Sequence, residues 1–252
     1  MLMWLLQIYG RGQSSIQRNV NDQVLARYER KTMKKSAMFS AIVLIVALSC
    51  FAAGSWFASE TKTTDSLLND KGKGTYDLLA HWSQGHVVAL IRHAERCDRS
   101  DHQCLEGDSG ITVPGMEMSL KLGQDFKALL NLDMTDIFNS PVKRTAQTAK
   151  FIFGNSSIEK PWLLDDCNGN LLNDIFEYKE DDKNMVLVTH SSCINNLEDP
   201  EGKKMINLRE NGQKTYGVTI FLAVDQKARQ AHVLGFLFPD DWQAIRNRTM
   251  PD

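Results

Sequence analysis

Three short apolar runs constrain the fold of this chain of 252 residues more than any other feature of its sequence. They are rich in β-branched and aliphatic residues and cover residues 86–91 (HVVALI), 135–140 (TDIFNS) and 185–190 (MVLVTH). Continuous runs of this length are typical of strands that are covered on both faces, as in a parallel sheet. Two further strands are predicted over residues 216–224 and 231–238, on either side of a polar turn.

Helical patterns lie between the predicted strands. Apolar residues with helical spacing occur over residues 118–129, 142–153 and, more weakly, 170–178. The pair Ser140 and Pro141 predicts the start of the second helix, because serine is a preferred N-cap and proline a preferred first residue. Since strands and helices alternate, we predict an α/β domain with a mainly parallel central sheet and helices on both faces.

One segment near the N-terminus has a different character. Residues 37–58 contain no ionisable acid or base, and as a helix they would be about 30 Å long, roughly a bilayer core. We predict a signal peptide or a transmembrane anchor here, in preference to a buried core helix. The positive-inside rule then places the bulk of the chain outside the cytoplasm, because the residues before the segment are more basic than those after it: Arg27, Arg30, Lys31, Lys34 and Lys35 precede it, and Glu60, Lys62 and Asp65 follow it.

The remaining boundaries follow from this segment. Residues 1–36 are predicted to be a cytoplasmic tail, or the product of a mis-assigned start codon that ends in a basic n-region, since Met33 would make a conventional start. Residues 59–75 are polar and are predicted to form a linker. The folded domain is therefore expected over residues 76–252.

Polar residues gather directly after the three core strands, in the stretches RHAER, NSPVKRTAQTA and THSSC. In an open α/β sheet, ligands bind outside the carboxyl ends of the strands. The three stretches therefore predict one basic pocket that contains Arg92, His93, Arg96, Arg144 and His190. The formal net charge of the chain is only −2, which argues against a general nucleic-acid binder and makes any attraction for anions local.

These residue types suit the chemistry of a phosphate group. Arginine offers planar pairs of N–H donors to phosphate oxygens. A neutral histidine ring nitrogen can attack phosphorus, and water then hydrolyses the phosphohistidine. Surface salt bridges for the arginines and a structural role for the histidines are the alternative. The sequence has no glycine-rich phosphate loop and no nucleotide fingerprint, and we expect no cofactor and no metal.

Four ordered blocks, LIRHAER, GITVPGMEMSLKLGQDF, SPVKRTAQTA and VLVTHSS, resemble the landmarks of the histidine phosphatase superfamily, also called the phosphoglycerate mutase-like family. The resemblance covers most of the chain over residues 86–193. It implies that His93 becomes phosphorylated, that Arg92 and Arg144 clamp the phosphoryl group, and that His190 stabilises its equatorial oxygens. Arg96 is a further candidate for phosphate binding.

The stretches RHAERCDRSDHQC, LLDDC and THSSC are similar to those of bacterial lipopolysaccharide core heptose(II)-phosphate phosphatases, which are exported members of this superfamily. This resemblance implies a phosphorylated sugar or glycolipid of the lipopolysaccharide core as the substrate. It also implies a location in the periplasm, either as a soluble protein after signal cleavage or anchored to the inner membrane.

Four cysteines lie in the exported part of the chain. An even number outside the cytoplasm favours disulfides, and we predict the pairs Cys97 with Cys104 and Cys167 with Cys193. The alternative is a zinc ion bound by Cys97, His102, Cys104 and one further ligand. This spacing is too wide for the usual paired-cysteine knuckle, which disfavours zinc.

Two positions depart from the family pattern. Ala94 stands where the family commonly has glycine after the nucleophile, and a methyl group is tolerated there only if the backbone is not at positive φ. No glutamate aligns clearly with the family's general acid, so Asp165, Asp166 and Asp174 are candidates, with Asp166 preferred. Glu95 is expected to orient an arginine, or else to serve as the missing acid.

The sequence therefore predicts an exported phosphomonoesterase that removes a phosphate, from heptose of the lipopolysaccharide core, through a phosphohistidine intermediate. The alternatives are a mutase, a phosphohistidine or other sugar-phosphate phosphatase, and a non-catalytic envelope module that binds phosphorylated glycolipid. No nucleic-acid partner is expected, and membrane contact is expected only through residues 37–58 if they are not cleaved.

Overall fold

The computed structural model describes residues 64–69, 72–164, 170–199, 201–206 and 215–249. The predicted tail and the predicted signal or anchor, residues 1–58, lie outside the described residues. Within the described part of the chain, no helix combines the length and the apolar character needed to cross a membrane.

A single six-stranded sheet forms the centre of the domain, with the strand order β3-β2-β4-β1-β5-β6. The pairs β3–β2, β2–β4 and β4–β1 are parallel, whereas β5 is antiparallel to both β1 and β6. The prediction of a mainly parallel sheet is confirmed. The strands are β1 Val87–Arg92, β2 Thr135–Asn139, β3 Ile158–Glu159, β4 Asn184–Thr189, β5 Thr219–Asp225 and β6 Gln230–Leu237.

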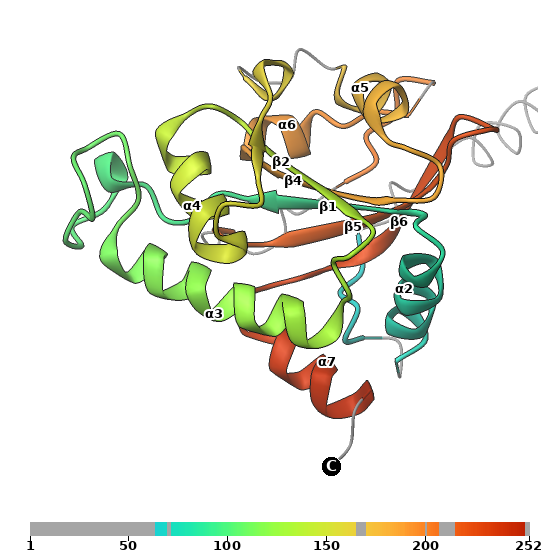
Figure 1. The fold of residues 1–252 in the computed structure, drawn as a ribbon, viewed down its shortest axis with the longest axis horizontal. Helices are drawn as coiled ribbons and strands as arrows, with labels where there is room; N and C mark the ends of the chain where they lie inside the picture. Colours follow the sequence, from blue (N-terminus) through green and yellow to red (C-terminus); the bar gives the residue numbers. More distant parts are fainter. Residues whose placement is uncertain (1–63, 70–71, 165–169, 200, 207–214, 250–252) are drawn as a thin grey trace, which may run out of the picture. The chain divides into compact units, whose positions relative to one another are not determined.

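Helices cover both faces of the sheet, as predicted (Figure 1). One face packs against α2, α3, α4 and α7, and the other packs against α5 and α6. Side chains of β1 alternate between the two cores, with Ala89 and Ile91 on the first face and Val88 and Leu90 on the second. The helices are α2 Lys73–Ser83, α3 Val113–Leu129, α4 Lys143–Phe153, α5 Leu171–Tyr178, α6 Ser191–Asn195 and α7 Asp241–Thr249.

The packed part of the domain reaches back into the region predicted as linker. Leu67 is only 1% exposed in the first core, and Ser66 forms an isolated bridge with Phe236 of β6. Helix α2 begins at Lys73, three positions before the predicted start of the domain. The polar composition of this region concealed the two leucines that anchor it, Leu67 and the partly buried Leu68.

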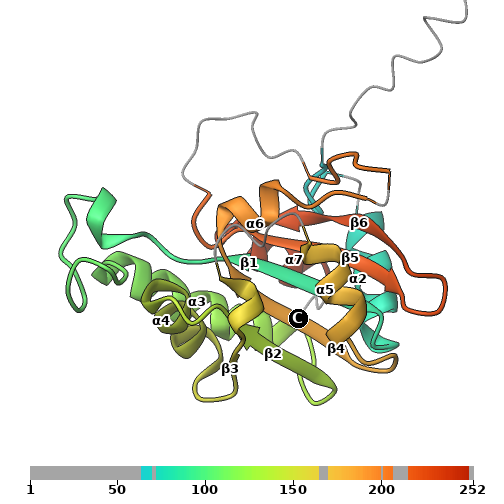
Figure 2. The ribbon, with the colours of Figure 1, turned by 90° about the horizontal axis from the view of Figure 1, so that it is seen from above.

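The segment between β1 and α3, residues 94–112, leaves the sheet at the carboxyl end of β1 and projects beside α3 and α4 (Figure 2). Two isolated antiparallel bridges, Arg96 with Ile111 and Cys104 with Thr112, fold this segment back on itself. We call residues 94–112 the arm.

Candidate active site

The carboxyl ends of β1 and β4 place two histidines side by side. Arg92 is the last residue of β1 and lies opposite Thr189, the last residue of β4, so His93 and His190 are the first residues beyond two paired strands. The His93 backbone N–H donates to the Thr189 carbonyl at 3.0 Å. The two imidazole rings lie 5.5 Å apart between centroids.

Arg144, in the first turn of α4, lies between these histidines. Its Nε donates to Nε2 of His93 at 3.3 Å, and its terminal Nη2 lies 3.2 Å from Nδ1 of His190. The predicted convergence of His93, Arg144 and His190 is therefore present in the fold, although the three residues come from distant parts of the chain.

The hydrogen bonds of His93 define which ring nitrogen is available for chemistry. Nδ1 lies 2.8 Å from the carbonyl oxygen of Ala94, which only accepts, so Nδ1 carries the proton. Nε2 therefore presents its lone pair toward Arg144. A neutral ring with an unprotonated Nε2 is the form of histidine that can attack an electrophile.

Burial keeps His93 in this neutral form. The residue is only 3% exposed, and desolvation together with the positive charges of Arg144 and Arg92 lowers the pKa of His93 to about 3. The hydrogen bond to the Ala94 carbonyl opposes this shift without cancelling it. At neutral pH the ring is thus unprotonated at Nε2.

The hydroxyl of Ser140 orients His190. Because the Arg144 guanidinium can only donate, Nδ1 of His190 accepts, and Nε2 carries the proton toward the Ser140 oxygen at 3.0 Å. The prediction of Ser140 as the N-cap of the following helix is wrong. Helix α4 begins at Lys143 with Val142 as its N-cap.

Arg92 is held by the turn that precedes β5. Its Nη1 donates to the Thr215 hydroxyl, and its guanidinium carbon lies 4.3 Å from the centre of the Tyr216 ring. Burial lowers the pKa of Arg92, but an arginine remains charged at any physiological pH. Among the described residues, the buried Nε of Arg92 has no hydrogen-bond partner, so one donor is left for a bound anion.

Arg96 lies close enough for its charge to act on Arg92 and Arg144, but its own guanidinium is paired with Asp98. The Arg96 guanidinium forms a two-pronged contact with Asp98, from Nε to Oδ1 at 2.8 Å and from Nη2 to Oδ2 at 2.5 Å. Direct phosphate binding by Arg96 thus stays a prediction. The Glu95 carboxylate contacts His102 at 2.8 Å and the Thr112 hydroxyl at 3.0 Å, and its expected role in orienting an arginine or acting as the acid stays a prediction.

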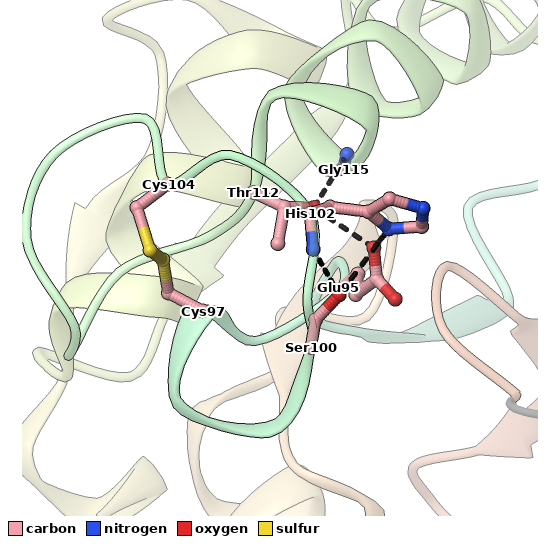
Figure 3. A network of polar contacts seen from close by, with 7 residues as sticks. All are labelled: Glu95, Cys97, Ser100, His102, Cys104, Thr112 and Gly115. Carbon is pink, nitrogen blue, oxygen red and sulfur yellow. Dashed lines mark hydrogen bonds and ion pairs between the residues drawn. A yellow bond between two sulfur atoms is a disulfide. The ribbon is translucent and has the colours of Figure 1, made fainter.

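The predicted disulfide between Cys97 and Cys104 is confirmed (Figure 3). Zinc ligation by these two cysteines is thereby excluded in the oxidised protein. Cys193 is also disulfide-bonded, whereas its predicted partner Cys167 lies outside the described residues. In the described ranges, no three His, Cys, Asp or Glu side chains are grouped so that they could hold a metal ion.

The backbone at Ala94 can accept a methyl group, because its φ angle is not positive. Arg229 is the only non-glycine residue with positive φ in the described part of the chain, so Ala94 has an ordinary backbone conformation. Its N–H donates to the Thr148 hydroxyl of α4 at 3.0 Å. Alanine at this position is therefore compatible with a nucleophile at His93.

The general acid has no assigned residue. Asp165 and Asp166, the preferred candidate, lie outside the described residues. Asp174 lies on α5, where burial and the nearby charge of Glu177 raise its pKa.

Several site residues were not predicted from the sequence. Thr215 and Tyr216 border Arg92, Ser140 orients His190, and Arg99 of the arm repels both Arg92 and Arg144. Ser140 directly follows a core strand, which is where ligand-binding side chains are expected. The pair Ser140 and Pro141 suggested a helix cap, so its role beside His190 was not predicted.

Comparison with known proteins adds an independent finding. Residues 88–167 match the family described as histidine phosphatase superfamily (branch 1). The chain is 34% identical over 148 residues to the lipopolysaccharide core heptose(II)-phosphate phosphatase of Salmonella arizonae, an alignment that covers 56% of this chain and 72% of that protein. It is 33% identical over 156 residues to the protein of the same name from Escherichia coli strain K12, which covers 61% of this chain and 74% of that one.

Among solved structures, the protein histidine phosphatase SixA complexed with tungstate aligns with a TM-score of 0.47 and 14% identity. This alignment covers 62% of the present chain and 98% of SixA.

Proposed function

Because this chain belongs to branch 1 of the histidine phosphatase superfamily and is a phosphatase, we propose that it hydrolyses phosphate monoesters through a covalent phosphohistidine at His93. The observation that carries the proposal is the protonation state and orientation of the His93 imidazole. Its Nδ1 proton is held by the Ala94 carbonyl, and its Nε2 lone pair faces the Arg144 guanidinium at 3.3 Å.

In the first step, the substrate phosphate enters between the His93 ring and the guanidinium groups of Arg92 and Arg144. Nε2 forms a bond to phosphorus while the bond from phosphorus to the ester oxygen breaks. The arginines stabilise the charge on the phosphoryl oxygens, a type of interaction worth about 10²-fold or more per donor. The departing alkoxide takes a proton from an acid, for which Asp166 remains our preferred candidate.

In the second step, water attacks the phosphohistidine, the carboxylate formed in the first step takes a proton from this water, and the phosphorus–nitrogen bond breaks to release phosphate. His93 leaves as a neutral ring because Nδ1 still carries its proton, so the starting state is restored. His190 contributes by donating to a phosphoryl oxygen. A phosphoryl oxygen only accepts, so His190 must carry a proton on Nδ1 in the complex, which the negative charge of the phosphate favours.

The substrate that we propose is a heptose phosphate of the lipopolysaccharide core. The support is the name shared by the relatives from Salmonella arizonae and Escherichia coli. Export to the periplasm, through residues 37–58, is part of the same proposal. The disulfide between Cys97 and Cys104 supports it, because disulfides persist mainly in oxidising compartments.

The test compares the wild-type chain with His93→Ala, using p-nitrophenyl phosphate and purified lipopolysaccharide as substrates. We expect phosphate release from both substrates to fall below detection in the variant. His86→Ala, which removes a histidine at the opposite end of β1, is the matched control and should keep wild-type rates. Mass spectrometry of the treated lipopolysaccharide identifies which phosphate is lost. Turnover that survives in His93→Ala would eliminate the phosphohistidine mechanism.

A further inference from the structure

The arm carries two further arginines, Arg96 and Arg99, whose charges act on both Arg92 and Arg144. We propose that Arg96 and Arg99 form a second anion subsite, which binds a further phosphate or carboxylate group on the leaving-group side of the substrate. This inference rests on the proposed phosphatase function and deepens it, because it defines the substrate class as sugar phosphates with a second anionic group.

The first argument is that the arm is rigid at the place where these arginines lie. The disulfide between Cys97 and Cys104 closes the loop that contains Arg99. The buried side of the arm is fixed by Glu95, whose carboxylate accepts from Thr112 at 3.0 Å and pairs with His102 at 2.8 Å (Figure 3). A flexible loop would lose conformational entropy on binding an anion, whereas a braced loop holds its charges in position beforehand.

The second argument is that the brace continues into α3. The Thr112 hydroxyl, which donates to Glu95, also accepts from the Gly115 backbone N–H at 3.1 Å and so caps the start of that helix. The Thr112 backbone N–H donates to the Glu95 carbonyl at 3.0 Å. The two ends of the arm, at Glu95 and at Thr112, are thus both tied to the start of α3. Arg96 directly follows Glu95 and is held in place with it.

The third argument is that the arm is attached to the helix that carries Arg144. Gln147 of α4 accepts from the Ile111 N–H at 2.9 Å and donates to Glu106 at 3.2 Å. Lys143, the residue before Arg144, lies 3.5 Å from the Glu106 carboxylate. These contacts hold the arm against the first turns of α4, on the side of the phosphate pocket.

The fourth argument is the balance of charge. Burial is the main cause that lowers the pKa of Arg92 and of Arg144, and repulsion from Arg96 and Arg99 adds to it in both cases. Among the described residues that shift these two arginines, Asp98 is the only carboxylate. A phosphate monoester carries about two negative charges near neutral pH. Arg92, Arg96, Arg99 and Arg144 carry four positive charges, whereas a bound phosphate monoester and Asp98 together supply about three negative charges. About one positive charge therefore remains uncompensated.

The contact between Arg96 and Asp98 shows what the subsite can hold. A carboxylate that accepts from two nitrogens of one guanidinium has the geometry with which arginine also binds phosphate. Asp98 is exposed, and Arg99, also exposed, has no carboxylate within ion-pair distance in the described part of the chain. An anionic group on the substrate can thus approach Arg99 directly and share or replace Asp98 at Arg96.

The test uses two ligands that differ by one anionic group and that the enzyme does not hydrolyse. They are butylphosphonate and a butane bisphosphonate with one phosphonate at each end. Their dissociation constants are measured by calorimetry with the full chain. Because the bisphosphonate has two equivalent ends, a preference of about twofold is expected from statistics alone, and we expect about tenfold for the wild type from two partly exposed charge pairs.

Two substitutions in the arm should move this preference in opposite directions. Arg99→Gln should reduce it to about two- to threefold, whereas Asp98→Asn, which removes the competing carboxylate, should increase it. The matched control is Lys127→Gln, which also removes one positive charge. Lys127 lies near the end of α3, about 20 Å along the helix from the arm, and its variant should keep the wild-type preference.

A preference that stays near twofold in the wild type would overturn the second subsite, and so would a preference that Arg99→Gln leaves unchanged. Because neither phosphonate is turned over, these results do not depend on catalysis. Failure of the subsite would leave the phosphate release of the wild type and its loss in His93→Ala intact. Loss of the proposed function would appear only in the turnover assay.

Discussion

The neutral state of His93 has a consequence for folding stability that can be measured without any substrate. In the unfolded chain a histidine binds its proton near pH 6.5, whereas burial and two arginines lower the pKa of folded His93 to about 3. Between these two values the unfolded state binds more protons than the folded state. The folded protein therefore loses stability as the pH falls from about 6.5 toward about 3.

The magnitude follows from the size of the shift. Each pH unit inside this window changes the free energy of unfolding by about 1.4 kcal/mol. Lowering the pH from about 7 to about 5 should therefore cost about 2 kcal/mol through His93 alone. In His93→Gln the side chain does not titrate, so this part of the acid sensitivity should disappear.

The assay is urea unfolding of wild type and His93→Gln at both pH values, in buffer without phosphate. Tryptophan fluorescence reports the transition, since Trp82 and Trp242 are buried in the core. The quantity of interest is the difference between the two proteins in the stability that each loses on acidification. All other titrating groups are shared by the two proteins. Equal losses would show that His93 titrates near its ordinary pKa, and the argument from burial would be refuted.

Three further outcomes are expected. Arg144→Gln should lower kcat/KM for p-nitrophenyl phosphate by about 10²-fold or more, because it removes donors to the phosphoryl group, and a loss below tenfold would contradict that role. Tyr216→Leu should lower kcat/KM by about two- to fivefold through the lost contact with Arg92, whereas Tyr216→Phe should keep it, as steady-state kinetics can show. In the double variant Cys97→Ser with Cys104→Ser, the free energy of unfolding measured in urea should be about 2–3 kcal/mol lower than in the wild type. Unchanged stability would mean that the arm unfolds independently.

The strands that position the site were predictable because a strand that is buried on both faces appears in the sequence as a continuous apolar run. β1 and β4 are covered on both faces, so Val87–Ile91 and Met185–Val188 are all apolar. β3 has only two residues, both exposed, and α7 buries only Trp242 and Ile245. β3 is too short to show a period, α7 has too few apolar residues to show one, and both were missed.

The residues of the pocket were predictable where they directly follow a strand or start a helix, as His93, His190 and Arg144 do. The contacts inside the arm were not. Glu95 lies next to Arg96 in the sequence, yet it pairs with His102, because the folding of the arm brings these two side chains together. Thr215 contacts Arg92 across 123 positions of the chain, a separation over which one sequence gives no local signal.

The position of His93, directly after β1, explains how the fold maintains an arrangement that is electrostatically unfavourable on its own. Like charges of Arg92 and Arg144 converge on a buried ring, and both guanidinium groups are partly desolvated. β1 is hydrogen-bonded on both sides, by β4 and β5, so the backbone cannot move to relieve the repulsion. A bound phosphate supplies the missing negative charge. The same burial that disfavours the empty pocket therefore keeps Nε2 of His93 unprotonated and strengthens the attraction for a dianion.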